Sequence, residues 1–207
     1  MSLYESIYLA SASPRRRELL AQIGVRHEVR PADVDETPLP GEAPAVYVGR
    51  VAAAKAEAVW ADAGGVPVLA ADTSVVLGAE LFGKPADQTE GLRMLRALAG
   101  RTHEVLTAIA VRSSDGLAAA LSVSDVTFRA LSDEECLRYW QSGEPLGKAG
   151  GYAIQGLAAT FITRVSGSYS GVMGLPLAET ATLLATAGVR IWSNAAPVAH
   201  GSEEVTE

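Results

Sequence analysis

The sequence predicts an α/β protein with a mixed, twisted sheet flanked by helices, in two lobes around a central cleft. Strand-like and helical segments alternate in the first half of the chain. In the second half, two long strand-like runs flank a short turn and predict an antiparallel hairpin. No internal repeat or linker divides the chain. We therefore expect one domain over residues 1–194, followed by a disordered acidic tail over residues 195–207.

Three strands and three helices are expected in the first half. Ser13 and Pro14 mark the start of the first helix, because serine is a favoured N-cap and proline is tolerated at the first helical position. The apolar run 66–71 is typical of a strand buried on both faces, and it is expected to place Asp72 and Thr73 at its carboxyl end. Ligands of α/β sheets gather at such ends, which singles out Asp72. The expected strands lie at residues 6–10, 25–30 and 66–71, and the expected helices at residues 15–23, 45–63 and 88–98.

The second half begins with the hairpin. The sequence Ser-Ser-Asp-Gly at residues 113–116 is its turn. Ser132 and Glu135 have the spacing of a capping box and so begin a helix. His103 is expected in a strand and Cys136 in helix packing. The expected strands lie at residues 104–112, 118–130 and 161–165, the helices at residues 132–140 and 177–187, a glycine-rich segment at residues 147–156 and a turn at residues 166–171.

Composition narrows the classes of function. The chain has 207 residues, with 17 Lys and Arg against 24 Asp and Glu, so its net charge is −7. Non-specific binding to polymeric nucleic acid depends on a basic surface and is not expected. A single cysteine offers neither an internal disulfide nor a cysteine zinc site, which favours a reducing, cytoplasmic compartment. No apolar run approaches the roughly 18 residues of a membrane span, so no membrane partner is expected.

Basic residues cluster at the start of the first helix, in the sequence Ser11-Ala-Ser-Pro-Arg-Arg-Arg17. A helix N-terminus offers free N–H groups and a positive dipole end, and arginine adds forked donors that fit phosphate oxygens. Successive helical residues diverge by about 100°, so at most two of the three arginines face one ligand. We select Arg15 and Arg16 for a phosphate site. A solvated arginine run beside an ordinary N-cap remains the alternative.

Acidic residues supply a second cluster, with Asp35 and Glu36 in a loop and Asp72 after a buried strand. Carboxylate oxygens suit Mg²⁺ or Mn²⁺, which proteins bind with one or two carboxylates plus substrate phosphates. Asp72 is equally suited to act as the general base that activates water. The alternative for the loop acids is that they are simply solvated.

Lysines and one amide complete the candidates. Lys84 and Lys148 lie in tight turns that fix their direction, and either suits a phosphate as a point charge. Lys55 reaches the cleft only if its helix face points inward. Gln155, in the glycine-rich segment, has an amide that can read the edge of a base. Taken singly, each lysine is also compatible with a surface role, and the glycines with a bulge.

These motifs together resemble a known family. They are Ser11 to Arg16, Ala71-Asp72-Thr73, Gly83-Lys84-Pro85, Lys148 to Gly156, and Gly167-Ser168-Tyr169 followed by Gly174 to Leu177. In order and spacing, from about Ile7 to Val189, they resemble the Maf family of nucleotide pyrophosphatases. Ser142 to Leu146, with Thr73 and Gln155, resembles the branch that acts on dTTP and UTP. Departures from the family pattern are Ala153 and the segment Ser170 to Met173.

The resemblance implies an α/β fold like that of Maf and ITPase proteins. It also implies hydrolysis of a nucleoside triphosphate between the α and β phosphates, with Mg²⁺ or Mn²⁺, to a nucleoside monophosphate and pyrophosphate. Asp72 would be the proton acceptor and would bind the metal with Glu36. A homodimer is expected on the same ground. The alternatives are a nucleotide-sensing regulator of septum formation without catalysis, or a pyrophosphatase for modified nucleotides such as 7-methyl-GTP. The resemblance implies that Arg15, Thr73 and Gln155 discriminate between substrates and that Ser11, Arg16, Glu36, Lys55 and Lys84 line the cleft.

Overall fold

The computed structural model describes residues 4–192, so the expected tail at residues 195–207 lies outside the described residues. The strands are β1 (Ile7–Leu9), β2 (His27–Val29), β3 (Val68–Leu77), β4 (Glu80–Phe82), β5 (Thr102–Ser113), β6 (Gly116–Phe128) and β7 (Ile162–Ser166). The α-helices are α1 (Pro14–Gln22), α2 (Pro44–Trp60), α3 (Gln88–Leu98), α4 (Asp133–Gln141), α5 (Tyr169–Met173) and α6 (Leu177–Thr186), and two short 3₁₀ turns are η1 (Ala149–Gly151) and η2 (Leu157–Thr160).

The strands form one mixed sheet in the order β2-β1-β3-β5-β6-β7, with β4 paired to β3. β1 runs parallel to both β2 and β3, and the remaining pairs are antiparallel. The predicted hairpin is β5 and β6, which pair along their whole length around the turn. These findings confirm the predicted fold class.

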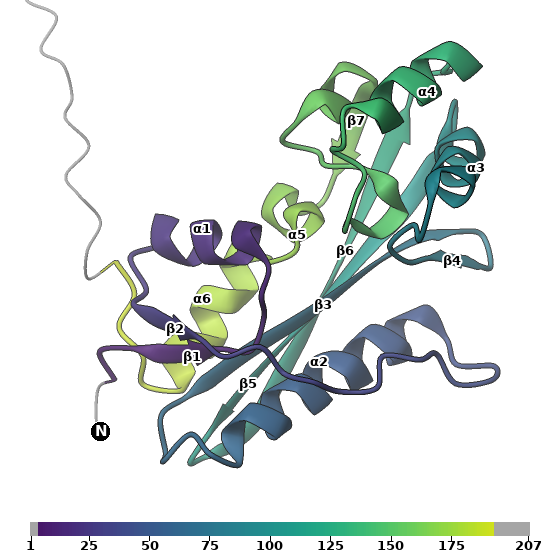
Figure 1. Cartoon of the computed structure of the whole chain (residues 1–207). Coiled ribbons are helices and arrows are strands. Elements are labelled where there is room, and N and C mark those ends of the chain that lie inside the picture. The colour runs from purple at the N-terminus through teal and green to yellow at the C-terminus, as the bar shows by residue number, and fades with distance from the viewer. Residues whose placement is uncertain (1–3, 193–207) are drawn as a thin grey trace, which may run out of the picture.

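Helices cover both faces of the sheet (Figure 1). The molecule has two ends, and the long strands β3, β5 and β6 run from one to the other (Figure 1). At one end, α1 and α6 pack with β1 and β2 around a core that includes Leu9, Leu20 and Leu184. At the other end, α3 and α4 pack around Phe82 and Phe128. A third core lies under α2, against the middle of the long strands. This arrangement provides the expected two lobes.

Local sequence signals account for the starts of α3 and α4. The capping box of α4 is present, with the Ser132 side chain accepting from Glu135 N–H and the Glu135 carboxylate accepting from Ser132 N–H. Asp87 caps α3 in the same way at Glu90 N–H. Ser13 is the N-cap of α1 by position, but its side chain makes no capping bond. The first N–H groups of an α-helix have no intrahelical partner, and in α1 the Ser13 side chain does not accept from them.

The expected end of the third strand is wrong. β3 continues to Leu77 instead of stopping at Ala71, because β5 pairs with it from Val68 to Val76 and supplies hydrogen bonds past the polar residues. Asp72 therefore lies in the middle of a ten-residue strand. The expected turn at residues 166–171 is also partly wrong, since α5 begins at Tyr169.

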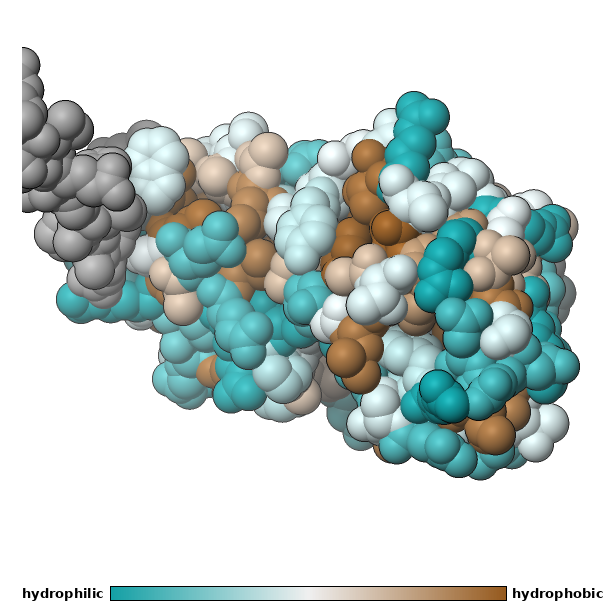
Figure 2. Space-filling view, turned by 90° about the horizontal axis from the view of Figure 1, so that it is seen from above, coloured by the Kyte–Doolittle hydropathy of each residue, from teal (hydrophilic) through white to brown (hydrophobic). Residues whose placement is uncertain are grey.

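The surface seen from above is mostly hydrophilic or intermediate, with apolar side chains in several separate places (Figure 2). No helix between residues 4 and 192 has the length and apolar composition needed to cross a lipid bilayer.

Candidate active site

A cavity of about 490 Å³ opens between the two lobes. Its size is within the range that holds a small ligand, roughly 300–1,000 Å³. Its walls come from the start of α1, the middle of β3, the β4–α3 connection and the glycine-rich segment around η1. Ten of the candidate residues line it: Ser11, Arg15, Arg16, Glu36, Lys55, Asp72, Thr73, Lys84, Lys148 and Gln155.

The cavity lies where one edge of β3 has no neighbouring strand. β1 pairs with β3 only as far as Leu69, and β4 pairs only from Val75 onward. The chain leaves the sheet after β1 and turns into α1, which opens the edge of β3 between these two pairings. Asp72 and Thr73 lie in this gap, so both reach the cavity although successive strand residues point to opposite faces.

Asp72 forms a buried ion pair with Lys55 of α2. Lys55 Nζ lies 2.9 Å from Asp72 Oδ1 and 2.9 Å from Glu36 Oε1, so one ammonium holds two carboxylates. Asp72 and Lys55 are 7% and 8% exposed. Burial raises the pKa of the Asp72 carboxyl, and the nearby charge of Lys55 opposes this shift. The result is a carboxylate that is more basic than an exposed aspartate and is held in one place.

The loop that brings Glu36 to the cavity is tied down by Tyr47, whose hydroxyl donates to the Glu36 carbonyl at 2.8 Å. The neighbouring Asp35 does not line the cavity, and its Oδ1 accepts from Thr37 N–H at 2.8 Å. Of the two loop acids, the structure therefore brings only Glu36 beside Asp72.

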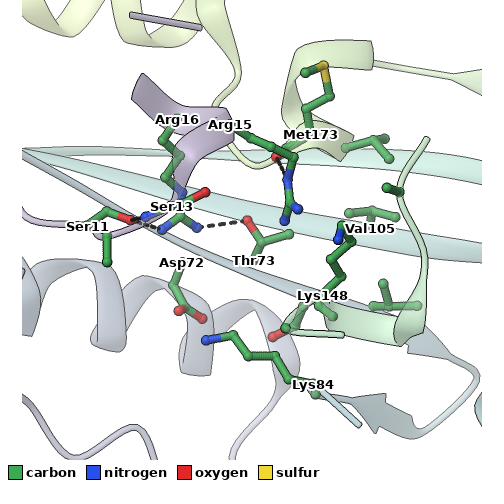
Figure 3. A pocket seen from close by; sticks show the side chains of 18 of the residues that line it. Ser11, Ser13, Arg15, Arg16, Asp72, Thr73, Lys84, Val105, Lys148 and Met173 are labelled. Carbon is green, nitrogen blue, oxygen red and sulfur yellow. Dashed lines mark hydrogen bonds between the residues drawn. The ribbon is translucent and has the colours of Figure 1, made fainter. Parts of the chain in front are cut away.

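The Arg16 guanidinium is held by three acceptors. It donates to Gly174 O at 2.8 Å. It also donates to Ser11 Oγ at 2.9 Å and to Thr73 Oγ1 at 3.2 Å (Figure 3). Burial lowers the pKa of Arg16 to about 10, with the charge of Asp72 acting in the opposite direction. At neutral pH the guanidinium is thus a fixed cation at the cavity wall.

Three further cations reach the cavity. Arg15 donates to Met173 O at 3.2 Å, and Figure 3 shows its guanidinium near the Lys148 ammonium. Burial and the charge of Arg15 lower the pKa of Lys148, which also donates to Glu144 O at 2.5 Å. The Lys84 side chain points toward the Asp72 carboxylate from the opposite wall (Figure 3). Arg17, the third arginine of the run, is exposed and does not line the cavity, so Arg15 and Arg16 are the two arginines of the run that face it.

Gln155 lies at the exposed rim of the cavity, and Glu144 fixes the loop on both sides of it. Glu144 accepts from Leu157 N–H at 2.8 Å and from Tyr139 OH at 2.8 Å. Tyr139 OH in turn accepts from Ala153 N–H at 3.2 Å. A Cβ at residue 156, next to Gln155, would lie 2.2 Å from Glu144 Oε2, which explains the glycine there.

The donor set suits a divalent cation. Glu36 and Asp72 contact the same ammonium, Glu36 through Oε1 and Asp72 through Oδ1. Two carboxylates plus substrate phosphates make up a normal Mg²⁺ environment. Residues 4–192 contain no cluster of three or more His, Cys, Asp or Glu side chains arranged for a metal, so phosphate oxygens would have to complete the coordination.

Thr107 of β5 is not among the residues predicted from the sequence. It lies directly opposite Thr73, and the two hydroxyl oxygens are 2.9 Å apart. One signal was available, because Thr107 is the single hydroxyl-bearing residue between Val105 and Val111 of a strand that is otherwise apolar there. Tyr47 was also missed, and its alanine-rich helix carries no signal for a contact with the acidic loop.

Comparison with known proteins identifies the family. A family model described as Maf-like protein matches residues 6–187. A dTTP/UTP pyrophosphatase from Cupriavidus pinatubonensis is 53% identical over 91% of this chain and all of that protein. A dTTP/UTP pyrophosphatase from Cereibacter sphaeroides is 57% identical over 92% of this chain and all of that protein. Among solved structures, a HAM1 protein from Coxiella burnetii covers 89% of this chain with a TM-score of 0.49 and 16% identity. The family model and the curated relatives show that the chain belongs to the Maf family.

Proposed function

We propose that this protein is a nucleoside triphosphate pyrophosphatase that hydrolyses dTTP and UTP to the nucleoside monophosphate and pyrophosphate. The observation that carries the proposal is a buried carboxylate, Asp72, in a cavity lined by five cationic side chains, within a chain whose net charge is −7. Membership in the Maf family and the names of the similar proteins support the same substrates.

Asp72 is the general base of the proposed reaction. Its carboxylate takes a proton from a water molecule, and the water oxygen attacks the α-phosphorus. The bond from the α-phosphorus to the bridging oxygen breaks, and pyrophosphate leaves with the electron pair. Burial of Asp72 raises its pKa and so strengthens the base, while Lys55 keeps it ionised. The oriented carboxylate thus performs the one proton transfer that attack by water requires.

The cations stabilise the negative charge of the reaction. Arg15 and Arg16 lie at the N-terminus of α1, where free N–H groups and the helix dipole also favour phosphate. Lys84 and Lys148 reach the cavity from the other lobe. These positive groups offset charge on the phosphoryl oxygens and on the departing pyrophosphate, which is the main task in phosphoryl transfer.

A divalent cation, Mg²⁺ or Mn²⁺, belongs to the proposal. Glu36 and Asp72 would hold it together with substrate phosphates, and it would add positive charge at the phosphoryl oxygens. A cytoplasmic location, which the single cysteine favours, and a homodimer are further parts of the proposal. Base selection is assigned to Gln155, whose amide would pair with the imide edge of the pyrimidine, with Arg15 and Thr73 contributing.

The first test measures pyrophosphate release from UTP, dTTP, CTP, GTP, ATP and 7-methyl-GTP with Mg²⁺ or Mn²⁺. We expect UTP and dTTP to be the best substrates. The variant Asp72→Asn should lose about 10²–10⁴-fold in kcat, the usual contribution of a general base, and still bind nucleotide. Asp62→Asn, an exposed site just past α2, is the matched control and should be fully active. Undiminished turnover in Asp72→Asn would remove this residue from the mechanism.

Two other outcomes separate the alternatives. Nucleotide binding without pyrophosphate release from any substrate would favour a nucleotide sensor. Preference for 7-methyl-GTP would favour a pyrophosphatase for modified nucleotides.

Gln155→Ala should lower the ratio of UTP hydrolysis to GTP hydrolysis, because it removes the amide proposed to read the base. An unchanged ratio would mean that another residue selects the base.

A further inference from the structure

A chain of hydrogen bonds leads from the cavity into the buried sheet. Arg16 donates to Thr73 Oγ1 at 3.2 Å, Thr73 Oγ1 lies 2.9 Å from Thr107 Oγ1, and Thr107 donates to Gly171 O at 2.8 Å. Thr107 is completely buried and does not line the cavity. Its side chain therefore contacts no ligand of that cavity directly.

The chemistry of the end groups fixes the direction of every bond in this chain. A carbonyl oxygen only accepts, so the single hydroxyl proton of Thr107 goes to Gly171 O. A guanidinium only donates, so the bond between Arg16 and Thr73 runs from Arg16. Because the Thr107 proton is already used, Thr73 must be the donor in the hydrogen bond between the two threonines, and Thr107 the acceptor.

This arrangement determines what Thr73 presents to the cavity. Its proton is committed inward, so the oxygen faces Arg16 as an acceptor. The same guanidinium is held from the side of α5 by Gly174 O at 2.8 Å, three residues after the carbonyl that accepts from Thr107. Both ends of the hydrogen-bond chain are therefore anchored on one segment, residues 171–174, and Arg16 is fixed between them.

We propose that Thr107 is a positioning residue for the reaction, acting through Thr73 to hold the Arg16 guanidinium in its phosphate-binding orientation. The proposal rests on the proposed function, because it takes Arg16 as a phosphate ligand. Without the Thr107 hydroxyl, Thr73 is free to turn its proton toward the cavity. Arg16 then faces a donor in place of an acceptor and loses one of its three fixed contacts.

Two variants separate positioning from simple packing. Thr107→Val keeps the shape of the side chain and removes the hydroxyl. Thr107→Ser keeps the hydroxyl and removes a buried methyl group, which lowers stability. A packing role predicts that activity follows the melting temperature, so the serine variant would be affected at least as much as the valine variant. A positioning role predicts that activity follows the hydroxyl.

The experiment measures kcat and KM for UTP, the affinity for inorganic tripolyphosphate and the melting temperature. In Thr107→Val we expect kcat/KM and tripolyphosphate affinity to fall about tenfold, which corresponds to one hydrogen bond to a charged group. Thr107→Ser should restore both to within about twofold of the starting protein, despite a lower melting temperature. Thr102→Val removes a hydroxyl at another position of β5, from the exposed pair that Thr102 forms with Thr127 of β6, and should change neither quantity.

The outcomes distinguish this proposal from the proposed function. If the unaltered protein hydrolyses UTP and Thr107→Val matches it in kcat/KM and in tripolyphosphate affinity, the positioning role is wrong and the proposed function stands. A serine variant as impaired as the valine variant also overturns it. If the unaltered protein releases no pyrophosphate, the proposed function fails, and the tripolyphosphate affinities of the two variants still decide the role of Thr107.

Discussion

His103 should make the fold sensitive to mild acid. It is 2% exposed on β5, its Nε2 lies 2.9 Å from Tyr152 OH, and its Nδ1 is buried without a hydrogen-bond partner among the described residues. The ring contacts Phe128 and Tyr152 edge to face. Burial lowers the pKa of His103 to about 4, because this apolar site gives a charged imidazolium no solvation.

The size of the effect follows from proton linkage. In the unfolded chain the pKa of histidine is about 6.5, so the unfolded state binds a proton first as pH falls. At pH 5, about 97% of unfolded molecules carry that proton, against about 9% of folded ones. Stability is therefore fully retained above pH 6.5 and decreases between 6.5 and about 4. Between pH 8 and pH 5 the free energy of unfolding should drop by about 2 kcal/mol from this residue.

Urea denaturation at pH 8 and pH 5 measures this drop. The variant His103→Gln retains a group that can hydrogen bond to Tyr152 but has no titratable ring. In this variant the drop in the free energy of unfolding between pH 8 and pH 5 should be smaller by about 2 kcal/mol than in the unaltered protein. Tyr152→Phe is the control. It keeps the histidine buried and should keep the pH dependence, since burial is the cause of the pKa shift. An equal loss in His103→Gln and in the unaltered protein would refute the reasoning.

Two further predictions concern the site and the core. Lys55→Met removes a cation that lowers the pKa of Asp72, so this pKa should rise and the acidic limb of the pH profile of kcat/KM should move to higher pH. An acidic limb that does not move would contradict the assignment of Asp72 as the general base. Gly91→Ala places a Cβ 2.1 Å from the Trp140 ring and should cost about 1–3 kcal/mol in urea denaturation. Gly49→Ala is the matched control, because Gly49 lies in α2 and a Cβ added there has no atom within 4 Å. It should stabilise the protein by up to about 1 kcal/mol. Equal effects of the two substitutions would contradict the close packing of Gly91 against Trp140.

Much of the fold could be predicted because its signals are local. α3 begins and ends at the predicted residues, Gln88 and Leu98, since a capping aspartate precedes it and a glycine follows closely. The β5–β6 hairpin follows from its turn and its two strand-like runs. The end of β3 was wrong because three polar residues, 72–74, resemble a strand terminus, whereas cross-strand pairing with β5 extends the strand beyond them.

Ten charged or polar residues that line the cavity could be predicted from the sequence, but their contacts could not. Arg16 and Gly174 are 158 positions apart, and only the packing of α1 against α5 brings them together. Thr73 and Thr107 are 34 positions apart, and their pairing depends on the register of the antiparallel strands β3 and β5. No local sequence pattern sets the register between β3 and β5, because β4 and α3 separate them in the sequence. The hydrogen bonds behind the cavity can therefore be read only from the folded structure.

The most direct test of the central claim is the fate of the oxygen that water contributes. Asp72 is expected to direct water to the α-phosphorus, so hydrolysis of UTP in ¹⁸O-labelled water should place one heavy oxygen in UMP and none in pyrophosphate, as read by mass spectrometry. Label in pyrophosphate would mean attack at the β-phosphorus. That result would contradict the geometry proposed for Asp72 and the cations around it.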